Sequence, residues 1–183
     1  MGKPTTRLHE ALVWAAQSHA GQDRDGESPL PYITHVVEVV NELRHTGGVT
    51  DETMLVAAVL HDIVESGGVS AGDVAKKFGT EVAGLVAELT RTEPTEEQME
   101  GKSEREIWDM RSSLLLEDIQ RMSSTAQTIK LADRISNFTH ALRTKKGGKK
   151  KRYVKQTERI LATVPRKTNS GLWKKLYGMV VDV

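Results

Sequence analysis

The residues best suited to chemistry lie in an apolar segment that reads MLVAAVLHDIVES, residues 54–66. Seven apolar residues precede His61 and Asp62 and two more follow them, so a helix formed here would be buried over most of its surface. An ionised carboxylate is costly to bury unless it is paired or bound to a cation. An isolated His-Asp pair is more often structural, but here other polar residues accompany it.

Glu65 stands four residues after His61 and three after Asp62. We predict one helix over residues 52–65, which would place all three side chains on one arc facing a single cleft. A metal-binding pair with a carboxylate base beside it is a hydrolytic arrangement. Glu65 is therefore the predicted catalytic base.

Two further segments offer ligands for a metal. In IKLADRISN, the residues Lys130, Asp133 and Asn137 fall on one face of a predicted helix. In PYITH, the Pro-Tyr pair stiffens the start of a valine-rich helix, and His35 is a polar group on its apolar face. Three helices can therefore bring polar side chains to one place.

The predicted ligand set is His35, His61, Asp62 and Asp133. The chain has no Cys, so any metal must be held by imidazole and carboxylate groups. This mixture suits Mn²⁺, Fe²⁺ or Zn²⁺ better than Ca²⁺. The metal would polarise a phosphoryl oxygen and lower the pKa of a bound water that Glu65 positions or deprotonates. The residues thus predict metal-assisted phosphoester hydrolysis.

Apolar residues recur with helical spacing almost throughout, and no segment alternates convincingly with period two. We therefore expect an all-α fold, a helical bundle of about eight or more helices forming one domain over residues 1–183. This length suffices for a sizeable core. The lack of Cys, of an apolar signal core and of a run near the roughly 20 residues of a spanning helix predicts a soluble, cytoplasmic protein.

Capping and turn residues divide the chain into the expected helices. Ser70 with Asp73 and Ser103 with Glu106 resemble capping boxes. Trp108 lies in a helical pattern and is interpreted as a packing residue. Helices are expected at 5–19, from 34 to the Gly47-Gly48 stop, at 52–65, 70–78, about 82–89, 103–122, 125–144, 152–163 and 171–181. The acidic stretch 93–100 and the basic run 143–152 are expected to be loops.

Charge is unevenly distributed, although 26 Lys and Arg nearly balance 25 Asp and Glu. Residues 1–133 hold 12 basic and 23 acidic side chains, net −11, and residues 134–183 hold 14 basic and 2 acidic, net +12. From the basic run, Lys145, Lys149 or Arg152 could reach a polyphosphate. No nucleic-acid recognition motif accompanies the run, so nucleic-acid binding stays a minor alternative.

The ordered motifs resemble those of HD-domain phosphohydrolases. The closer resemblance is to the (p)ppGpp hydrolases, meaning the small alarmone hydrolases and the hydrolase domain of RelA/SpoT-type enzymes of the stringent response. It is carried by HAGQDRDGESPLPYITH, LHDIVES, FGTEVAGLVAELT and IKLADRISN, and extends over about residues 5–163, leaving a short helical C-terminal extension. It implies Mn²⁺ bound by the four predicted ligands and removal of the 3′-pyrophosphate from (p)ppGpp, leaving GDP or GTP.

The resemblance also implies substrate contacts. Arg24 matches the family arginine near the nucleobase, and Asn137 matches the asparagine that contacts ribose or phosphate. Lys130 matches a lysine with a structural or phosphate role, and Tyr153 a tyrosine near the nucleotide. His140 takes a position where the family often has a Thr near the substrate. Family members often self-associate, so the resemblance allows a homo-oligomer.

The chain departs from the family in two places that bear on activity. The family usually has Glu-Asp where this chain has Glu65-Ser66, and the Ser66 hydroxyl can hydrogen-bond water but cannot take its proton at neutral pH. Asp25 stands where a basic residue is common beside Arg24. Two alternatives therefore stay open: the same site acting on an adenine alarmone, NADPH or another phosphorylated nucleotide, and a catalytically weak, nucleotide-binding regulatory protein.

Overall fold

The computed structural model describes residues 6–26, 29–65 and 68–183, and these form ten α-helices and no β-strand. The all-α prediction is confirmed. The helices are α1 (Arg7–Ser18), α2 (Ile33–His45), α3 (Glu52–Val59), α4 (Ala71–Phe78), α5 (Thr80–Leu89), α6 (Glu96–Met99), α7 (Glu104–Arg121), α8 (Ser124–Thr144), α9 (Gly147–Thr163) and α10 (Ser170–Val181). No helix in the described part of the chain is both long and apolar enough to cross a membrane.

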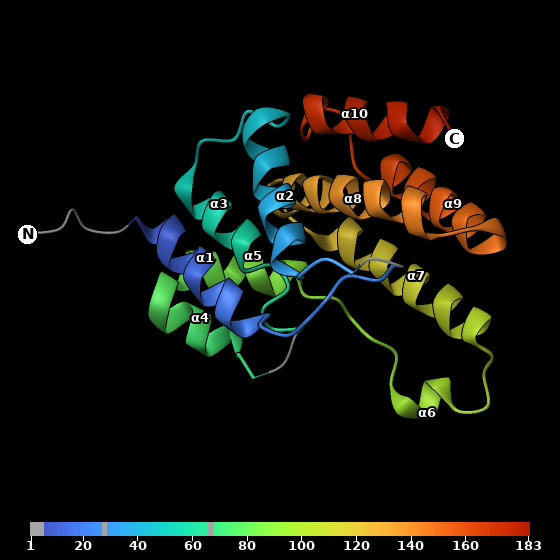
Figure 1. Ribbon diagram of the computed structural model, residues 1–183, viewed down its shortest axis with the longest axis horizontal. Helices are drawn as coiled ribbons and strands as arrows, with labels where there is room; N and C mark the ends of the chain where they lie inside the picture. The colour runs from blue at the N-terminus through green and yellow to red at the C-terminus, as the bar shows by residue number, and fades with distance from the viewer. Residues whose placement is uncertain (1–5, 27–28, 66–67) are drawn as a thin grey trace, which may run out of the picture.

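Helix α8 forms the centre of the molecule. It is contacted by α2, α3, α5, α9 and α10, and Figure 1 shows α2 crossing it while α10 lies along one side. Every residue from 126 to 136 is buried, including charged ones. A helix covered on all sides must compensate each of its charges internally, which makes α8 a natural location for a charged site.

The helix predicted over residues 52–65 is shorter than expected, because α3 ends at Val59 and residues 60–65 continue as turns. At this end the side chain of His61 bonds back to the last turn of the helix. Its Nδ1 lies 2.7 Å from the carbonyl oxygen of Ala58 and donates to it. In a continued helix that oxygen would accept from the N–H of Asp62. His61, Asp62 and Glu65 therefore do not share a helical arc.

The basic run 143–152 is mostly helical, which corrects the loop prediction. Helix α8 extends to Thr144, and α9 begins at Gly147 rather than near residue 152. Gly147 has a φ of +56°, a backbone conformation that costs glycine little and lets two helices join within two residues. Lys and Arg are good helix formers, so the first turns of α9 tolerate the charge.

The predicted capping boxes are confirmed, and a third is present. Ser70 with Asp73 begins α4, and Ser103 with Glu106 begins α7. In the acidic stretch expected as a loop, Thr95 caps the one-turn helix α6. Each box satisfies backbone N–H groups that a helix start leaves unpaired. These local signals fix where the helices begin.

Asp118 of α7 holds the segment that leads away from α5. Its nearly buried carboxylate accepts from the backbone N–H and the hydroxyl of Thr92, both at 2.9 Å, and from Arg121 at 2.7 Å. Burial raises the pKa of Asp118, but the Thr92 hydrogen bonds and Arg121 outweigh it and lower the pKa below its usual value. The ionised form therefore stabilises the fold.

Replacing this carboxylate by an amide, Asp118→Asn, should lower the free energy of unfolding at pH 7 by about 1–2 kcal/mol. Because the folded-state pKa lies below the unfolded value of about 3.9, the contribution is complete above that pH and is lost as the pH falls further, through the folded-state pKa. Urea titrations followed by circular dichroism from pH 7 down to about pH 2.5 should show a constant difference at neutral pH and convergence only below about pH 4.

Asp109→Asn, at an exposed aspartate of the same helix, is the matched control and should follow the wild type throughout. A constant difference between Asp118→Asn and wild type at all pH values would contradict the proposed role of the charge.

Candidate metal centre

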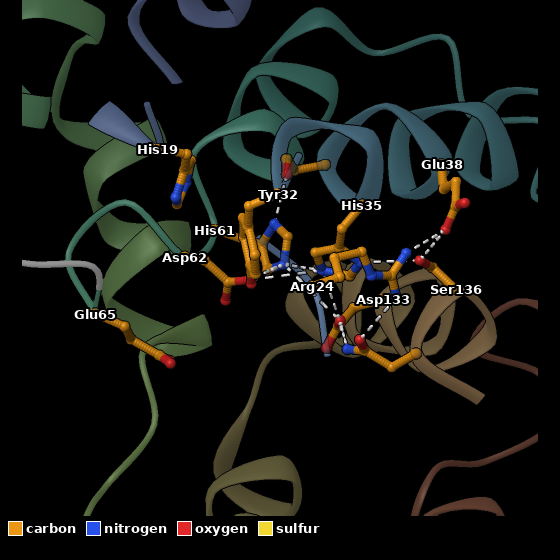
Figure 2. Close-up of polar contacts among 12 residues, drawn as sticks. His19, Arg24, Tyr32, His35, Glu38, His61, Asp62, Glu65, Asp133 and Ser136 are labelled. Atoms are coloured by element: carbon orange, nitrogen blue, oxygen red, sulfur yellow. Dashed lines mark hydrogen bonds and ion pairs between the residues drawn. The ribbon is translucent and has the colours of Figure 1, made fainter. Parts of the chain in front are cut away.

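Three predicted ligands, His35, His61 and Asp62, form a group that could hold a metal ion, and Asp133 lies beside them, as Figure 2 shows. His35 comes from α2, His61 and Asp62 from the turn after α3, and Asp133 from α8. The two histidine Nε2 atoms are 3.2 Å apart. Asp62 Oδ2 lies 3.0 Å from Nε2 of His61, and Asp133 Oδ1 lies 3.3 Å from Nε2 of His35. Two imidazole nitrogens and two carboxylate oxygens thus face a common centre.

The hydrogen bonds behind the two rings fix their tautomers. Nδ1 of His61 must carry a proton, because the Ala58 carbonyl oxygen can only accept. Nδ1 of His35 lies 2.8 Å from Oγ of Ser136, whose own hydroxyl donates to Glu38 at 2.6 Å, so this nitrogen is also a donor. Both Nε2 atoms therefore face the centre, and each offers a lone pair to a metal when its ring is neutral.

At these separations the two imidazoles and two carboxylates must share positive charge, either as protons on the imidazoles or as a bound cation. The donor set fits a divalent transition metal, for which neutral imidazole nitrogen and carboxylate oxygen are common ligands. Each ring has its other nitrogen hydrogen-bonded to a protein group, as is typical of metal-ligating histidines. The residues present therefore fit the predicted metal.

The surrounding charges favour positive charge at this centre. Burial lowers the pKa of His61, but Asp62 and Asp133 outweigh it and raise the pKa to about 9. Burial raises the pKa of Asp133, but Lys130 and the two histidines hold it far below its usual value. Nζ of Lys130 lies 2.9 Å from Asp133 Oδ2. Asp133 therefore stays ionised, whatever the cation that balances it.

Tyr32 also contributes to the centre, which the sequence did not reveal. Its hydroxyl donates a short hydrogen bond to Asp62 Oδ2. Burial, with the neighbouring Asp62 carboxylate, raises the pKa of Tyr32 well above its usual value, so the hydroxyl remains a donor. The only signal was its position three residues before His35, where it had been interpreted as stiffening the start of the helix.

Asp62 and Asp133 open into a cleft of about 480 Å³, a volume typical of small-molecule sites. The five predicted substrate residues all line it: Arg24, Lys130, Asn137, His140 and Tyr153. The structure therefore brings the substrate residues to the same space as the proposed metal ligands.

Several of these side chains are already engaged. Arg24 is buried, with NH1 2.8 Å from Glu38 Oε2. The Asn137 amide donates to Asp133 Oδ1 at 2.5 Å. The Tyr153 ring lies 3.9 Å from the guanidinium of Arg134. These contacts preorganise one wall of the cleft.

Glu65 lines the cleft but lies to one side of the four ligands (Figure 2). Its Oε1 accepts from the backbone N–H of Arg91 at 2.8 Å, and its Oε2 lies 2.9 Å from both Nε and NH2 of the same residue. The carboxylate is thus fixed by one arginine. Ser66, the other predicted catalytic residue, lies outside the described residues.

The wall opposite α8 carries residues that the sequence did not single out. Arg91 and Arg111 belong to the acidic half of the chain yet line the cleft, and Arg111 pairs with Glu93 at 2.7 Å. Trp108, interpreted as a packing residue, lines it too, with the guanidinium of Arg152 5.6 Å from its ring centroid. No motif or spacing in the sequence distinguished these residues.

The basic run contributes only in part. Lys145 lines the cleft, as predicted for a residue that reaches a polyphosphate. Lys149 and Arg152 are not among the described residues that line the cleft.

Known proteins share both the fold and the motifs. A family model for the HD domain matches residues 11–171. The guanosine-3′,5′-bis(diphosphate) 3′-pyrophosphohydrolase MESH1 of Drosophila melanogaster is 37% identical over 135 residues, covering 74% of this chain and 69% of that protein. The Xenopus tropicalis protein of the same name is 32% identical and covers 100% of this chain and 97% of that protein.

Solved structures agree with this result. The structure of a metazoan SpoT orthologue, which hydrolyzes ppGpp and plays a role in starvation responses, gives a TM-score of 0.82 at 31% identity, over 100% of this chain and 98% of that one. A Listeria monocytogenes structure with a TM-score of 0.62 at 24% identity supports the fold alone. The resemblance inferred from the motifs is confirmed: the chain belongs to the HD-domain family and is homologous to the MESH1-type (p)ppGpp 3′-pyrophosphohydrolases.

Proposed function

We propose that this HD-domain phosphohydrolase removes the 3′-pyrophosphate of (p)ppGpp, leaving GDP or GTP and pyrophosphate. The observation that carries the proposal is the cleft itself, which joins the four-ligand centre to a set of cationic side chains. Those side chains are Lys130, Lys145, Arg91 and Arg111. A nucleotide with diphosphates at two positions presents negative charge at both ends, which suits a cleft with separated cations. The relatives named for this reaction cover most or all of the chain.

The proposed cation is Mn²⁺, held by the two histidines and two aspartates, and the same donors suit Fe²⁺ or Zn²⁺. A cation bound there polarises a phosphoryl oxygen and lowers the pKa of a bound water. Lys130, kept protonated by Asp133 and Asp62 despite a burial that lowers its pKa, adds a fixed positive charge beside the reacting phosphate. Tyr32 holds Asp62 in place through its hydroxyl.

Glu65 is proposed to orient the attacking water and take its proton. The backbone N–H of Arg91 takes one acceptor position of Oε1, while its Nε and NH2 both contact Oε2. Each oxygen of an ionised carboxylate has two acceptor positions, so Oε1 keeps one for water. Arg91 thereby fixes Glu65 without excluding it from catalysis. For Ser66 the proposal rests on the sequence, since its hydroxyl can hydrogen-bond the same water.

The nucleoside is proposed to lie along the wall formed by α8 and α9. His140 and Tyr153 would contact it there, and Asn137 would contact the ribose or a phosphate. His140 Nε2 lies 2.5 Å from the backbone oxygen of Asp25, so the ring is held at the edge of the cleft. The wall is rigid because its side chains already pair with one another.

The substrate proposal is tested by incubating the purified protein with Mn²⁺ and ppGpp. We expect GDP and pyrophosphate in equal amounts by anion-exchange chromatography, with turnover abolished by EDTA. Asp133→Asn should remove both metal and activity. The same assay with NADPH and an adenine alarmone compares the alternative substrates.

Full Mn²⁺ occupancy with tight ppGpp binding and no turnover would refute the proposal and favour a regulatory protein. Turnover of NADPH or the adenine alarmone, but not of ppGpp, would support a hydrolase that acts on a different nucleotide.

Removing the proposed base, Glu65→Ala, should lower kcat by roughly 10²–10⁴-fold, the usual contribution of a general base. Mn²⁺ content measured by atomic absorption should equal that of the wild type, because Glu65 is not a ligand. Glu81→Ala, at an exposed glutamate of α5, is the matched control and should keep wild-type kcat. Wild-type kcat in Glu65→Ala would overturn the assignment.

A further inference from the structure

Two chains of hydrogen bonds behind the proposed metal centre both start from the side chain of Arg24. NH1 of Arg24 is 2.8 Å from Glu38 Oε2, and NH2 is 3.5 Å from Asn137 Oδ1. Glu38 Oε2 also accepts from the hydroxyl of Ser136 at 2.6 Å. The Arg24 guanidinium thus faces two acceptors that lie on different helices, Glu38 on α2 and Asn137 on α8. Figure 2 shows Arg24 beside Glu38.

Each of these acceptors leads on to a metal ligand. On one branch, Ser136 Oγ accepts from Nδ1 of His35 at 2.8 Å. On the other, the Asn137 amide donates to Asp133 Oδ1 at 2.5 Å. A single buried side chain is therefore connected to one imidazole ligand and one carboxylate ligand, through no more than two intermediate groups.

Arg24 is itself held firmly. Only 5% of its side chain is exposed, so little of it is free to contact a substrate. Its backbone N–H donates to the carbonyl of Leu30 at 2.9 Å, and Tyr32 N–H donates to Gln22 at 2.8 Å, which closes the loop around it. A buried guanidinium must be paired, and here Glu38 pairs it. The loop and the ion pair together fix the orientation of the Arg24 guanidinium.

The contacts of the Asn137 amide show how the Arg24 guanidinium acts on its neighbours. Its oxygen faces Arg24 and its nitrogen faces Asp133. The reversed amide would set an oxygen against the ionised Asp133 carboxylate and a nitrogen against the guanidinium, which is doubly unfavourable. Arg24 and Asp133 therefore favour the same amide orientation, in which Asn137 donates to Asp133. On the other branch Arg24 holds Glu38, whose charge makes Ser136 a better acceptor for His35.

We infer that Arg24 is a positioning residue for the metal centre, which orients His35 through Glu38 and Ser136 and orients Asp133 through Asn137. The role is distinct from the nucleobase contact that the resemblance implies. It rests on a metal being bound at the centre, as in the proposed function, but does not depend on which nucleotide is the substrate.

Titration of the metal-free protein with Mn²⁺ by calorimetry tests this inference without substrate. Groups that orient metal ligands typically contribute 10–100-fold to metal affinity, so Arg24→Gln and Ser136→Ala should each weaken Mn²⁺ binding by that factor. Loss of a positive charge would by Coulomb attraction alone tighten cation binding. Weakening in Arg24→Gln thus has the sign that only positioning predicts.

Two further variants separate positioning from charge and from folding. Arg111→Gln removes an arginine of the same cleft that is not connected to the ligands, and should leave Mn²⁺ affinity unchanged or slightly higher. Arg24→Lys keeps the positive charge but lacks the planar guanidinium that contacts Glu38 and Asn137 together, and should still weaken Mn²⁺ binding. If Arg24→Gln does not fold, as judged by circular dichroism, Arg24→Lys carries the test.

The hydrolysis assay then distinguishes the two roles of Arg24. Positioning predicts that excess Mn²⁺ restores much of the lost kcat in Arg24→Lys. A nucleobase contact predicts wild-type Mn²⁺ affinity and a raised KM that excess Mn²⁺ does not correct, and this result would overturn the inference. If the wild type binds Mn²⁺ but hydrolyses no nucleotide, the proposed function fails while the titration still decides the role of Arg24.

Discussion

Ionised Asp133 is buried in the middle of α8, and the site depends on how this charge is balanced. An unpaired carboxylate in such a place would cost several kcal/mol. Lys130 neutralises one oxygen, while the other faces Asn137 and His35. The contacts that offset the free-energy cost of burying Asp133 also orient its Oδ1 toward the proposed metal centre. The contacts that stabilise the buried charge of the central helix are therefore the same contacts that position Asp133 at the proposed metal site.

The charge asymmetry of the sequence does not map simply onto the two sides of the cleft. The basic half supplies Lys145, but Arg91 and Arg111 come from the acidic half. Glutamates around these arginines, such as Glu65 and Glu93, keep the local charge nearly balanced. What the cleft offers to an anionic ligand is therefore a pattern of separated cations rather than a uniformly positive surface. Such a pattern favours recognition of shape and charge positions together.

The end of α3 differs from the helical pattern of the sequence. The apolar run through residue 64 predicted a continuous helix, and local propensity gave no reason to stop it. After the helix ends, Nδ1 of His61 bonds to the carbonyl of Ala58, which places the Nδ1 proton and leaves Nε2 facing the proposed metal centre. Glu65 consequently leaves the arc of His61 and Asp62 and meets Arg91, 26 residues further along the chain.

The sequence by itself determined the helical class, the capping boxes and the four proposed ligands, because these depend on local spacing and on the cost of polar groups in apolar segments. The five substrate residues were placed by resemblance, and all of them line the cleft. Only the tertiary structure decided which groups stand behind the ligands. Tyr32, Glu38 and Ser136 have no distinctive spacing, and they matter because α2, α8 and the turn after α3 meet at one point. Hydrogen bonds between residues 30 to 113 positions apart, such as those of Tyr32 and Arg24, depend on packing that no local pattern encodes.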